Sequence, residues 1–193
     1  LGRDEATNAI IIRKALRAAA AELSSPLPAQ DLKHKLLQLA IDADVVLDLH
    51  CDNHAVMHLY ATPQHADTGV QLGRCLRAPL ALLAEESGDF PFDEACSTLW
   101  FKLRDKLGER VPLACFSATV EHRGETEVGH ALAAQDAEGL LRFLGLQGFI
   151  DGMDQPEPFE VAQRPLAGCM HVHAPHAGVV VFADPLGREV AAG

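Results

Sequence analysis

An aspartate and a histidine stand at the end of a short apolar run that is typical of a strand buried on both faces. The run is Val45–Leu49, with Asp48 inside it and His50 directly after it. Because side chains alternate along a strand, Asp48 and His50 should point to the same face. An imidazole there could hold a zinc ion, with Asp48 or Asp52 orienting the ligand. The alternative is a buried, hydrogen-bonded histidine beside a helix-capping aspartate.

A glutamate follows a second apolar run. Glu121 comes directly after Phe116–Val120, so we expect it where another buried strand emerges. A carboxylate near a metal-bound water can accept its proton, and His50 and Glu121 would make such a pair. Arg123 could neutralise a substrate carboxylate or a developing oxyanion. The alternative for Glu121 is an ordinary surface residue, paired with Arg123.

The other histidines and the nearest cysteine give weaker signals. His54 and His58 are interpreted as loop or surface residues that could also line a pocket near His50. Cys51 should point away from His50, and we interpret it as a small buried residue. A third histidine group could bind metal or lie on a solvated strand. Its members are His171, His173 and His176.

Helical and strand patterns alternate along the first three quarters of the chain, which predicts an α/β fold: a mixed, largely parallel sheet with helices on both faces. Residues 1–152 are assigned to this domain, and 153–193 to a β-rich C-terminal appendage with strands at 167–174 and 178–182. Residues 87–91 are predicted to form a loop. Helices are predicted at 4–23, 28–41, 66–76, 92–107 and 128–144, and strands at 45–50, 56–61, 80–83 and 113–120.

Charge and composition exclude several classes of partner. The net charge of −11 argues against nucleic acid and against anionic membrane surfaces, since both attract basic proteins. No apolar run approaches the ~20 residues of a membrane-spanning helix. The 5 cysteines are scattered, which favours reduced thiols and a cytoplasmic location.

Three motifs in this order resemble the succinylglutamate desuccinylase/aspartoacylase family, relatives of the zinc carboxypeptidases. They are Val45–His50 (V-V-L-D-L-H), Thr119–Glu121 (T-V-E) and the stretch Ala174–Val180 in a Gly/Pro-rich tail. The resemblance implies a zinc-dependent hydrolase of amide bonds in N-acyl amino acids or similar small substrates. It implies that His50 is a zinc ligand and that Glu121 is the general acid or base.

One part of the family pattern is missing. The resemblance implies two further zinc ligands from an H-x-x-E motif before His50, followed by an arginine–asparagine substrate clamp. The chain has one H-x-x-E, at 122–125, after the D-L-H strand. We therefore expect the first strands, two zinc ligands and the clamp to lie upstream of Leu1, and this segment alone to be inactive and largely metal-free.

Two other functions stay open. The domain could be a metal-free, carboxypeptidase-like binding module for a small acidic or peptide ligand. A hydrolase that uses His171 and His173 is a weaker alternative. The sequence leaves the oligomeric state open, although a sheet that lacks strands would expose an edge or an apolar face and so favour self-association into a homo-oligomer.

Overall fold

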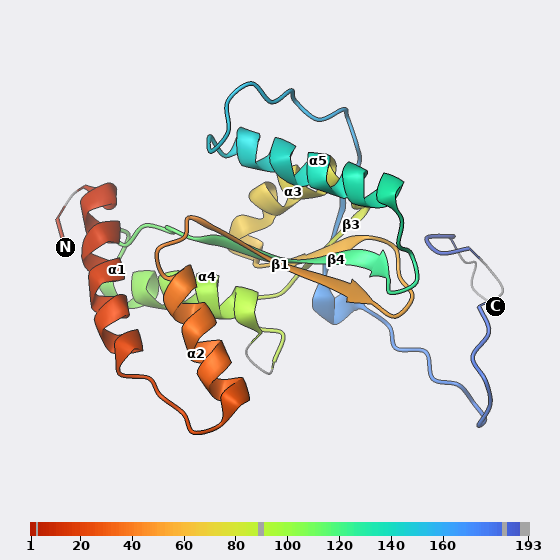
Figure 1. The fold of residues 1–193 in the computed structure, drawn as a ribbon, viewed down its shortest axis with the longest axis horizontal. Helices are drawn as coiled ribbons and strands as arrows, with labels where there is room; N and C mark the ends of the chain where they lie inside the picture. The colour runs from red at the N-terminus through yellow and green to blue at the C-terminus, as the bar shows by residue number, and fades with distance from the viewer. Residues whose placement is uncertain (3, 89–90, 183–184, 190–193) are drawn as a thin grey trace.

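A five-stranded sheet forms the centre of the protein (Figure 1). The computed structural model describes residues 1–2, 4–88, 91–182 and 185–189. The strands run in the order β1-β4-β2-β3-β5, and every neighbouring pair is parallel except β2 and β4. The predicted mixed, largely parallel sheet is therefore confirmed. The strands are β1 (Val45–Asp52), β2 (His58–Ala61), β3 (Leu80–Leu83), β4 (Phe116–Gly124) and β5 (Ala162–Pro165).

Helices cover both faces of this sheet, as predicted. In Figure 1, α3 and α5 lie above the sheet, while α4 lies below it with α2 and α1 alongside. Two short 3-10 turns, Pro63–His65 and Leu166–Gly168, complete the regular structure of the described residues. The helices are α1 (Glu5–Ala21), α2 (Pro28–Ala40), α3 (Ala66–Leu76), α4 (Phe92–Leu107) and α5 (His130–Leu146).

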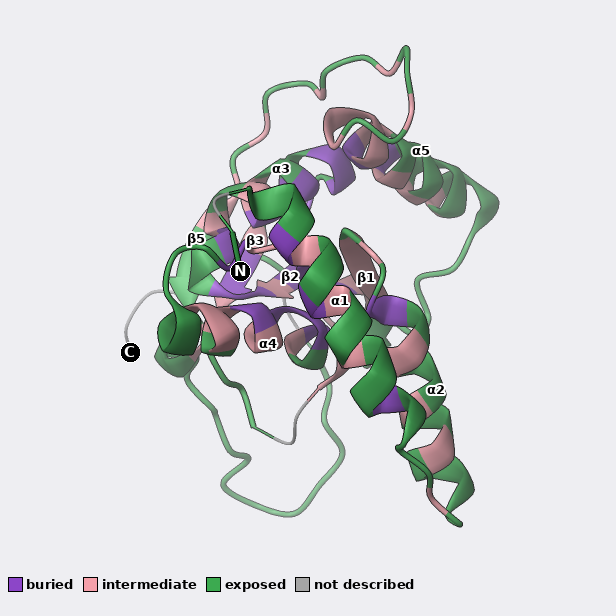
Figure 2. Ribbon diagram, turned by 90° about the vertical axis from the view of Figure 1, so that its left-hand side faces the viewer, coloured by how far each residue is buried: buried purple, intermediate pink, exposed green. Residues whose placement is uncertain are grey.

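The alternation of side chains divides the core into two clusters, one on each face. Phe116, Ala118 and Val120 of β4 point toward α3 and α5, where they pack with Phe143. On the other face, Trp100 of α4 packs with a second apolar group that includes residues of α1 and α2. Figure 2 shows the buried residues concentrated along the sheet and on the helix surfaces that contact it. The second cluster comprises Ile12, Ala40, Cys96, Trp100, Val111 and Cys115.

Most predicted elements lie within a few residues of their observed bounds. Among the predicted elements that are found, the largest difference in bounds concerns β4, which was predicted at 113–120 and extends from Phe116 to Gly124. Glu121 therefore lies inside the strand, where its backbone remains paired with β1 and β2. Of the predicted loop 87–91, Asp89 and Phe90 lie outside the described residues.

The C-terminal segment contributes one strand to the sheet. β5 pairs with β3, so part of the predicted appendage extends the sheet of the first domain. The two strands predicted at 167–174 and 178–182 are wrong, since the structure has a 3-10 turn and irregular chain there. Val172 and Val179 are strongly exposed, and no partner strand in the described residues lies beside them. The domain boundary after residue 152 stays a prediction.

None of the helices in the described ranges is long and apolar enough to cross a membrane.

Candidate functional site

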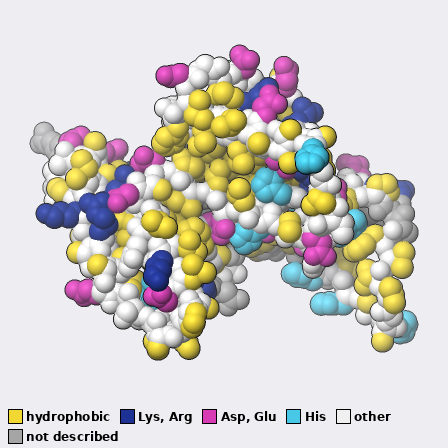
Figure 3. All heavy atoms as spheres, in the orientation of Figure 1, with side chains coloured by type: hydrophobic (Ala, Val, Ile, Leu, Met, Phe, Trp, Pro, Cys, Tyr) yellow, Lys and Arg dark blue, Asp and Glu magenta, His cyan; other side chains and the backbone are white. Residues whose placement is uncertain are grey.

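The parallel pairing of β1 with β4 brings the predicted residues together at the carboxyl ends of both strands. Asp48 is opposite Thr119, and His50 is opposite Glu121. The His50 Nε2 atom lies 3.0 Å from Asp48 Oδ1, and the Nδ1 atom lies 3.9 Å from Glu121 Oε1. Asp48 and His50 share a face, as the alternation predicts. In Figure 3, most histidine side chains visible on this side of the molecule gather on its right-hand half, between the end of β1 and the C-terminal segment.

A cavity of about 280 Å³ opens beside this pair. Its walls come from four strands of the sheet or the residues that follow them, from the start of α4 and from the turn after β5. Because β2 and β3 run opposite to β1 and β4, the cavity lies on one face of the sheet, under the start of α4, and at the end of the sheet that holds His50 and Glu121 it reaches the carboxyl ends of β1 and β4 alone. The lining residues are His50, Tyr60, Ala61, Thr62, Leu82, Ala84, Ser87, Pro91, Asp93, Glu94, Thr119, Glu121 and Leu166.

Glu121 is held in the wall of the cavity with one oxygen free. Its side chain is 14% exposed, and its Oε2 atom is buried without a hydrogen-bond partner among the described residues. A buried carboxylate oxygen without a partner costs free energy, so it is available to accept a hydrogen bond from a ligand. Glu121 therefore combines a fixed position with an unused acceptor atom.

Asp93 is a cavity residue that the sequence did not reveal. It stands in the first turn of α4 and is 5% exposed. Burial raises its pKa, and the charges of Glu94 and Asp48 add to this, while hydrogen bonds from the Glu94 amide and the Thr119 hydroxyl act in the opposite direction. Its carbonyl oxygen accepts a hydrogen bond of 2.5 Å from Ser117 Oγ. The start of α4 is thus fixed to the polar face of β4.

His58 and Tyr60 form a hydrogen-bonded pair on β2, next to Glu121. His58 Nδ1 lies 2.9 Å from the Val56 carbonyl oxygen, and Nε2 lies 3.2 Å from the Tyr60 hydroxyl. Because a carbonyl only accepts, the His58 Nδ1 atom is the donor in the contact with Val56, and the Tyr60 hydroxyl is the partner of Nε2. Burial raises the pKa of Tyr60, and the negative charges of Glu121 and Asp52 raise it further. His58 is buried, which corrects its interpretation as a loop or surface residue.

Three predicted site residues are not among those that line the cavity: Asp48, which contacts His50, and Asp52 and Arg123. Asp52 is exposed, and its Oδ1 accepts the Asn53 N–H at 2.6 Å. The Arg123 guanidinium donates to Asp136 of α5 at 2.5 Å, so it is turned toward the helix. The suggested pair between Glu121 and Arg123 is not formed. Arg123 also has a φ of +67°, a conformation uncommon outside glycine, which bends the chain at this point.

Cys51 is exposed, although the sequence analysis interprets it as a small buried residue. β1 is an edge strand of the described sheet, and the second half of the strand, from Leu49 to Asp52, is exposed. The first half of the strand is only partly buried, so the prediction of a strand buried on both faces is wrong. His54, in the loop that follows, stacks on Phe182 of the C-terminal segment, with ring centres 4.2 Å apart.

The described residues do not form a complete zinc site. They contain no group of three or more His, Cys, Asp or Glu side chains that could hold a metal ion together. A catalytic zinc takes about three protein ligands, and here His50 offers one imidazole with carboxylates close to it. The histidines at 171, 173 and 176 are exposed and do not supply the missing ligands.

Comparison with known proteins finds similarity at the level of solved structures. No protein-family model matches the sequence, and a search of curated proteins finds no match. A succinylglutamate desuccinylase/aspartoacylase family protein from Shewanella amazonensis is 27% identical, with a TM-score of 0.83 over 95% of this chain and 51% of its own. A similar protein from Shewanella frigidimarina is 25% identical, with a TM-score of 0.80 over 93% of this chain and 49% of its own.

A third structure shares the fold alone. The product-bound ectoine utilization protein EutE (DoeB) from Ruegeria pomeroyi is 15% identical, with a TM-score of 0.53 over 74% of this chain and 42% of its own. The chain thus spans about half the length of the two Shewanella proteins. The comparison covers nearly all of this chain, which contains the sheet and the cavity described above.

Proposed function

Because this chain has the fold of the succinylglutamate desuccinylase/aspartoacylase family, we propose that it forms part of a deacylase that hydrolyses amide bonds in small N-acyl compounds. The observation that carries this proposal is the position of Glu121. Its free Oε2 lies in the wall of a cavity, and its Oε1 lies 3.9 Å from His50 Nδ1. Amide hydrolysis needs a group that removes a proton from water and returns it to the leaving amine, and a fixed glutamate can do both.

The neighbours of Glu121 have supporting roles. Asp48, whose Oδ1 lies 3.0 Å from His50 Nε2, could hold the imidazole at the mouth of the cavity. Tyr60, whose pKa is raised, keeps its proton at neutral pH and lines the cavity, where its oxygen could accept a hydrogen bond from an N–H of the substrate.

We propose zinc as the cofactor, with His50 as one of its ligands. Zinc would polarise the amide carbonyl and lower the pKa of a bound water. Since the described residues supply a single histidine, this assignment needs further ligands from the rest of the protein. The proton transfer assigned to Glu121 depends only on residues described above.

Glu121→Gln in the full-length protein tests the proposal. The amide cannot accept a proton, so the rate of deacylation should fall by at least about 100-fold, while zinc content stays unchanged. Glu125→Gln is the matched control, because Glu125 is exposed just beyond the same strand. Turnover that survives Glu121→Gln would remove Glu121 from this role.

A metal-free binding module is the second candidate. The incomplete ligand set of the described residues favours it. Zinc content after dialysis separates the two: the deacylase predicts stoichiometric zinc in the full-length protein and very little in this chain alone. A full-length protein without zinc and without deacylation would favour the binding module. Tight, stoichiometric zinc in this chain alone would contradict our count of the ligands.

A further inference from the structure

A β-bulge interrupts β4 directly after Glu121. His50 is opposite Glu121, and the next paired residues are Asp52 and Gly124. β1 thus advances by two residues while β4 advances by three, so β4 carries one extra residue there. Glu121 is also the last residue of β4 that pairs with β2. Bulges redirect the side chains beside them and are common next to active sites. The direction of the Glu121 side chain therefore depends on what holds the bulge in place.

The backbone of the bulge is strained at Arg123. Its φ is +67°, in the left-handed region that residues other than glycine adopt rarely. In a regular strand Arg123 and His122 would point to opposite faces, but both reach Asp136 of α5. A backbone conformation of this kind persists only where neighbouring contacts hold it.

Asp136 supplies such contacts from the helix. Its Oδ2 atom accepts the Arg123 guanidinium and lies 3.2 Å from His122 Nδ1. The side chains of Arg123 and Asp136 are 14% and 13% exposed. A second nitrogen of the guanidinium lies 3.8 Å from the sulfur of Met57, a buried residue directly before β2. The ion pair is therefore enclosed between α5 and the start of β2.

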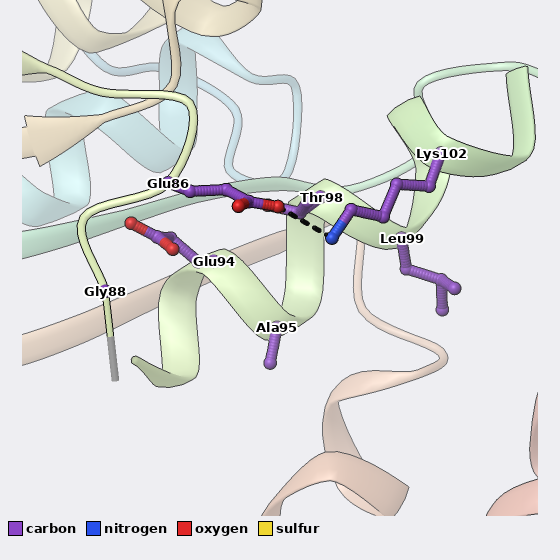
Figure 4. Close-up of a pocket in the computed structure, with 7 residues that line it drawn as sticks. All are labelled: Glu86, Gly88, Glu94, Ala95, Thr98, Leu99 and Lys102. Carbon is purple, nitrogen blue, oxygen red and sulfur yellow. Dashed lines mark ion pairs between the residues drawn. The ribbon is translucent and has the colours of Figure 1, made fainter. Parts of the chain in front are cut away.

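An ion pair on the outer surface of α4 provides the comparison. Lys102 and Glu86 lie 2.8 Å apart in Figure 4, and their side chains are 56% and 62% exposed. Exposed pairs of this kind contribute little, because water screens the charges. Removal of one member of an enclosed pair instead leaves a charge without its partner, and the remaining side chain has to move. Loss of Asp136 should therefore release Arg123 and the bulge.

We propose that Asp136 is a positioning residue for Glu121: through Arg123 and His122 it fixes the bulge that directs the Glu121 carboxyl group into the wall of the cavity. This inference rests on the proposed role of Glu121 in proton transfer and adds the residue that sets its direction. Asp136 belongs to α5, on the face of the sheet opposite α4, and is not among the residues that line the cavity (Figure 1). A displacement of about 1 Å can slow a reaction by ~100-fold, so removal of Asp136 should affect the reaction more than substrate binding.

Hydrogen exchange in the full-length protein, measured by mass spectrometry, tests the positioning without requiring turnover. In Asp136→Asn, the amides of residues 121–124 should exchange about tenfold faster, while those of residues 116–120 stay within about twofold of the wild type. Lys102→Gln, which breaks the exposed pair, should change neither segment. Unchanged exchange of residues 121–124 in Asp136→Asn would overturn the inference.

The split between kcat and KM separates positioning from a general loss of structure. With N-acetyl-L-aspartate and N-succinyl-L-glutamate as substrates, Asp136→Asn and Arg123→Gln should each lower kcat about tenfold and leave KM within about twofold. The double variant should lose no more than either single variant, because both changes break the same contact. Gly139→Ala is the structural control: it crowds α5 against the Cys75 carbonyl oxygen and should leave kcat unchanged.

An unchanged kcat in both single variants, an equal fall of kcat in Gly139→Ala, or losses that add in the double variant would each overturn the inference. Failure of the proposed function gives a different result. Turnover that survives Glu121→Gln, or no turnover of either amide by the wild-type protein, would count against the deacylase role of Glu121. The exchange of residues 121–124 would still decide whether Asp136 holds the bulge.

Discussion

The two faces of β4 differ in their chemistry: one is apolar and packs in the core, and the other is polar and faces α4 and the cavity. Toward α3 and α5 the strand presents Phe116, Ala118 and Val120, all buried in a continuous apolar cluster. Toward α4 it presents Ser117, Thr119 and Glu121, which bond to Asp93 or line the cavity. Side chains one residue apart therefore belong to two different environments.

The residues of β4 that stabilise the fold therefore lie on one face of the sheet, and those with a proposed functional role lie on the other. The apolar face gains free energy from burial, at roughly 25 cal/mol for each Å² removed from water. The polar face buries Asp93 and leaves an oxygen of Glu121 without a partner, which lowers stability. Such losses are common where a chain keeps polar groups available for a ligand.

Among the substitutions that compare the two faces, Phe143→Ala on the apolar face should lower the free energy of unfolding most. Phe143 is fully buried on the apolar face, with its ring centre 5.7 Å from that of Phe116. Removing the ring leaves a cavity and should lower the free energy of unfolding by about 3–5 kcal/mol, measured by urea denaturation. Leu141→Ala, on an exposed part of the same helix, is the control. A similar loss in both variants would show that α5 is not anchored through Phe143.

Gly139→Ala tests the packing on the apolar face at the contact between α3 and α5. A Cβ at this position would lie 2.6 Å from the Cys75 carbonyl oxygen, so the helices would have to separate. Despite the better helix propensity of alanine, we expect a loss of about 1–3 kcal/mol in the same denaturation experiment. Gly129→Ala, where a Cβ has no neighbour within 4 Å, should change stability little. An unchanged midpoint for Gly139→Ala would mean that the two helices pack less closely.

Asp93→Asn, on the polar face, should change stability least of the three, and it should raise the stability at neutral pH. Burial raises the pKa of Asp93 above its ordinary value of 3.8, so the folded protein binds more protons than the unfolded chain between these two values. The stability that this group contributes is therefore present at low pH and is lost as the pH rises through the folded pKa. Asparagine cannot ionise, so the variant should melt about 2–4 °C higher at pH 7, and the gain should disappear near pH 3.

Asp105→Asn serves as the control for the same scans, because Asp105 is exposed. A lower melting temperature for Asp93→Asn at pH 7 would contradict the prediction. It would mean that the hydrogen bonds from Thr119 and Glu94 stabilise the charged carboxylate more than burial opposes it.

The sequence was sufficient for those parts of the site that depend on one strand at a time. The alternation along β1 placed Asp48 and His50 on one face, and their atoms lie 3.0 Å apart. The fold class followed from the alternation of helical and strand patterns. Both predictions use short-range periodicity, which a single sequence displays directly.

The sequence was insufficient where distant elements meet. Asp93 lies in the predicted helix 92–107 without a sequence pattern that marks it, and only the packing of α4 on β4 places it beside Thr119. Arg123 was a reasonable anion partner by charge, but its orientation depends on Asp136 of α5. The predicted C-terminal strands had suitable apolar residues but no partner strand, which no local pattern reveals.

The strand order also has a consequence for how the protein folds. β2, α3 and β3 are consecutive in the chain and form a compact unit with short connections, so we expect them to form first. β1 precedes this unit in the chain but pairs with β4, where Val45 is opposite Phe116. The contact between β1 and β4 must therefore wait until Phe116–Gly124 has been synthesised. His50 and Glu121 come together only at that late stage, so the site assembles after the first folded unit already exists.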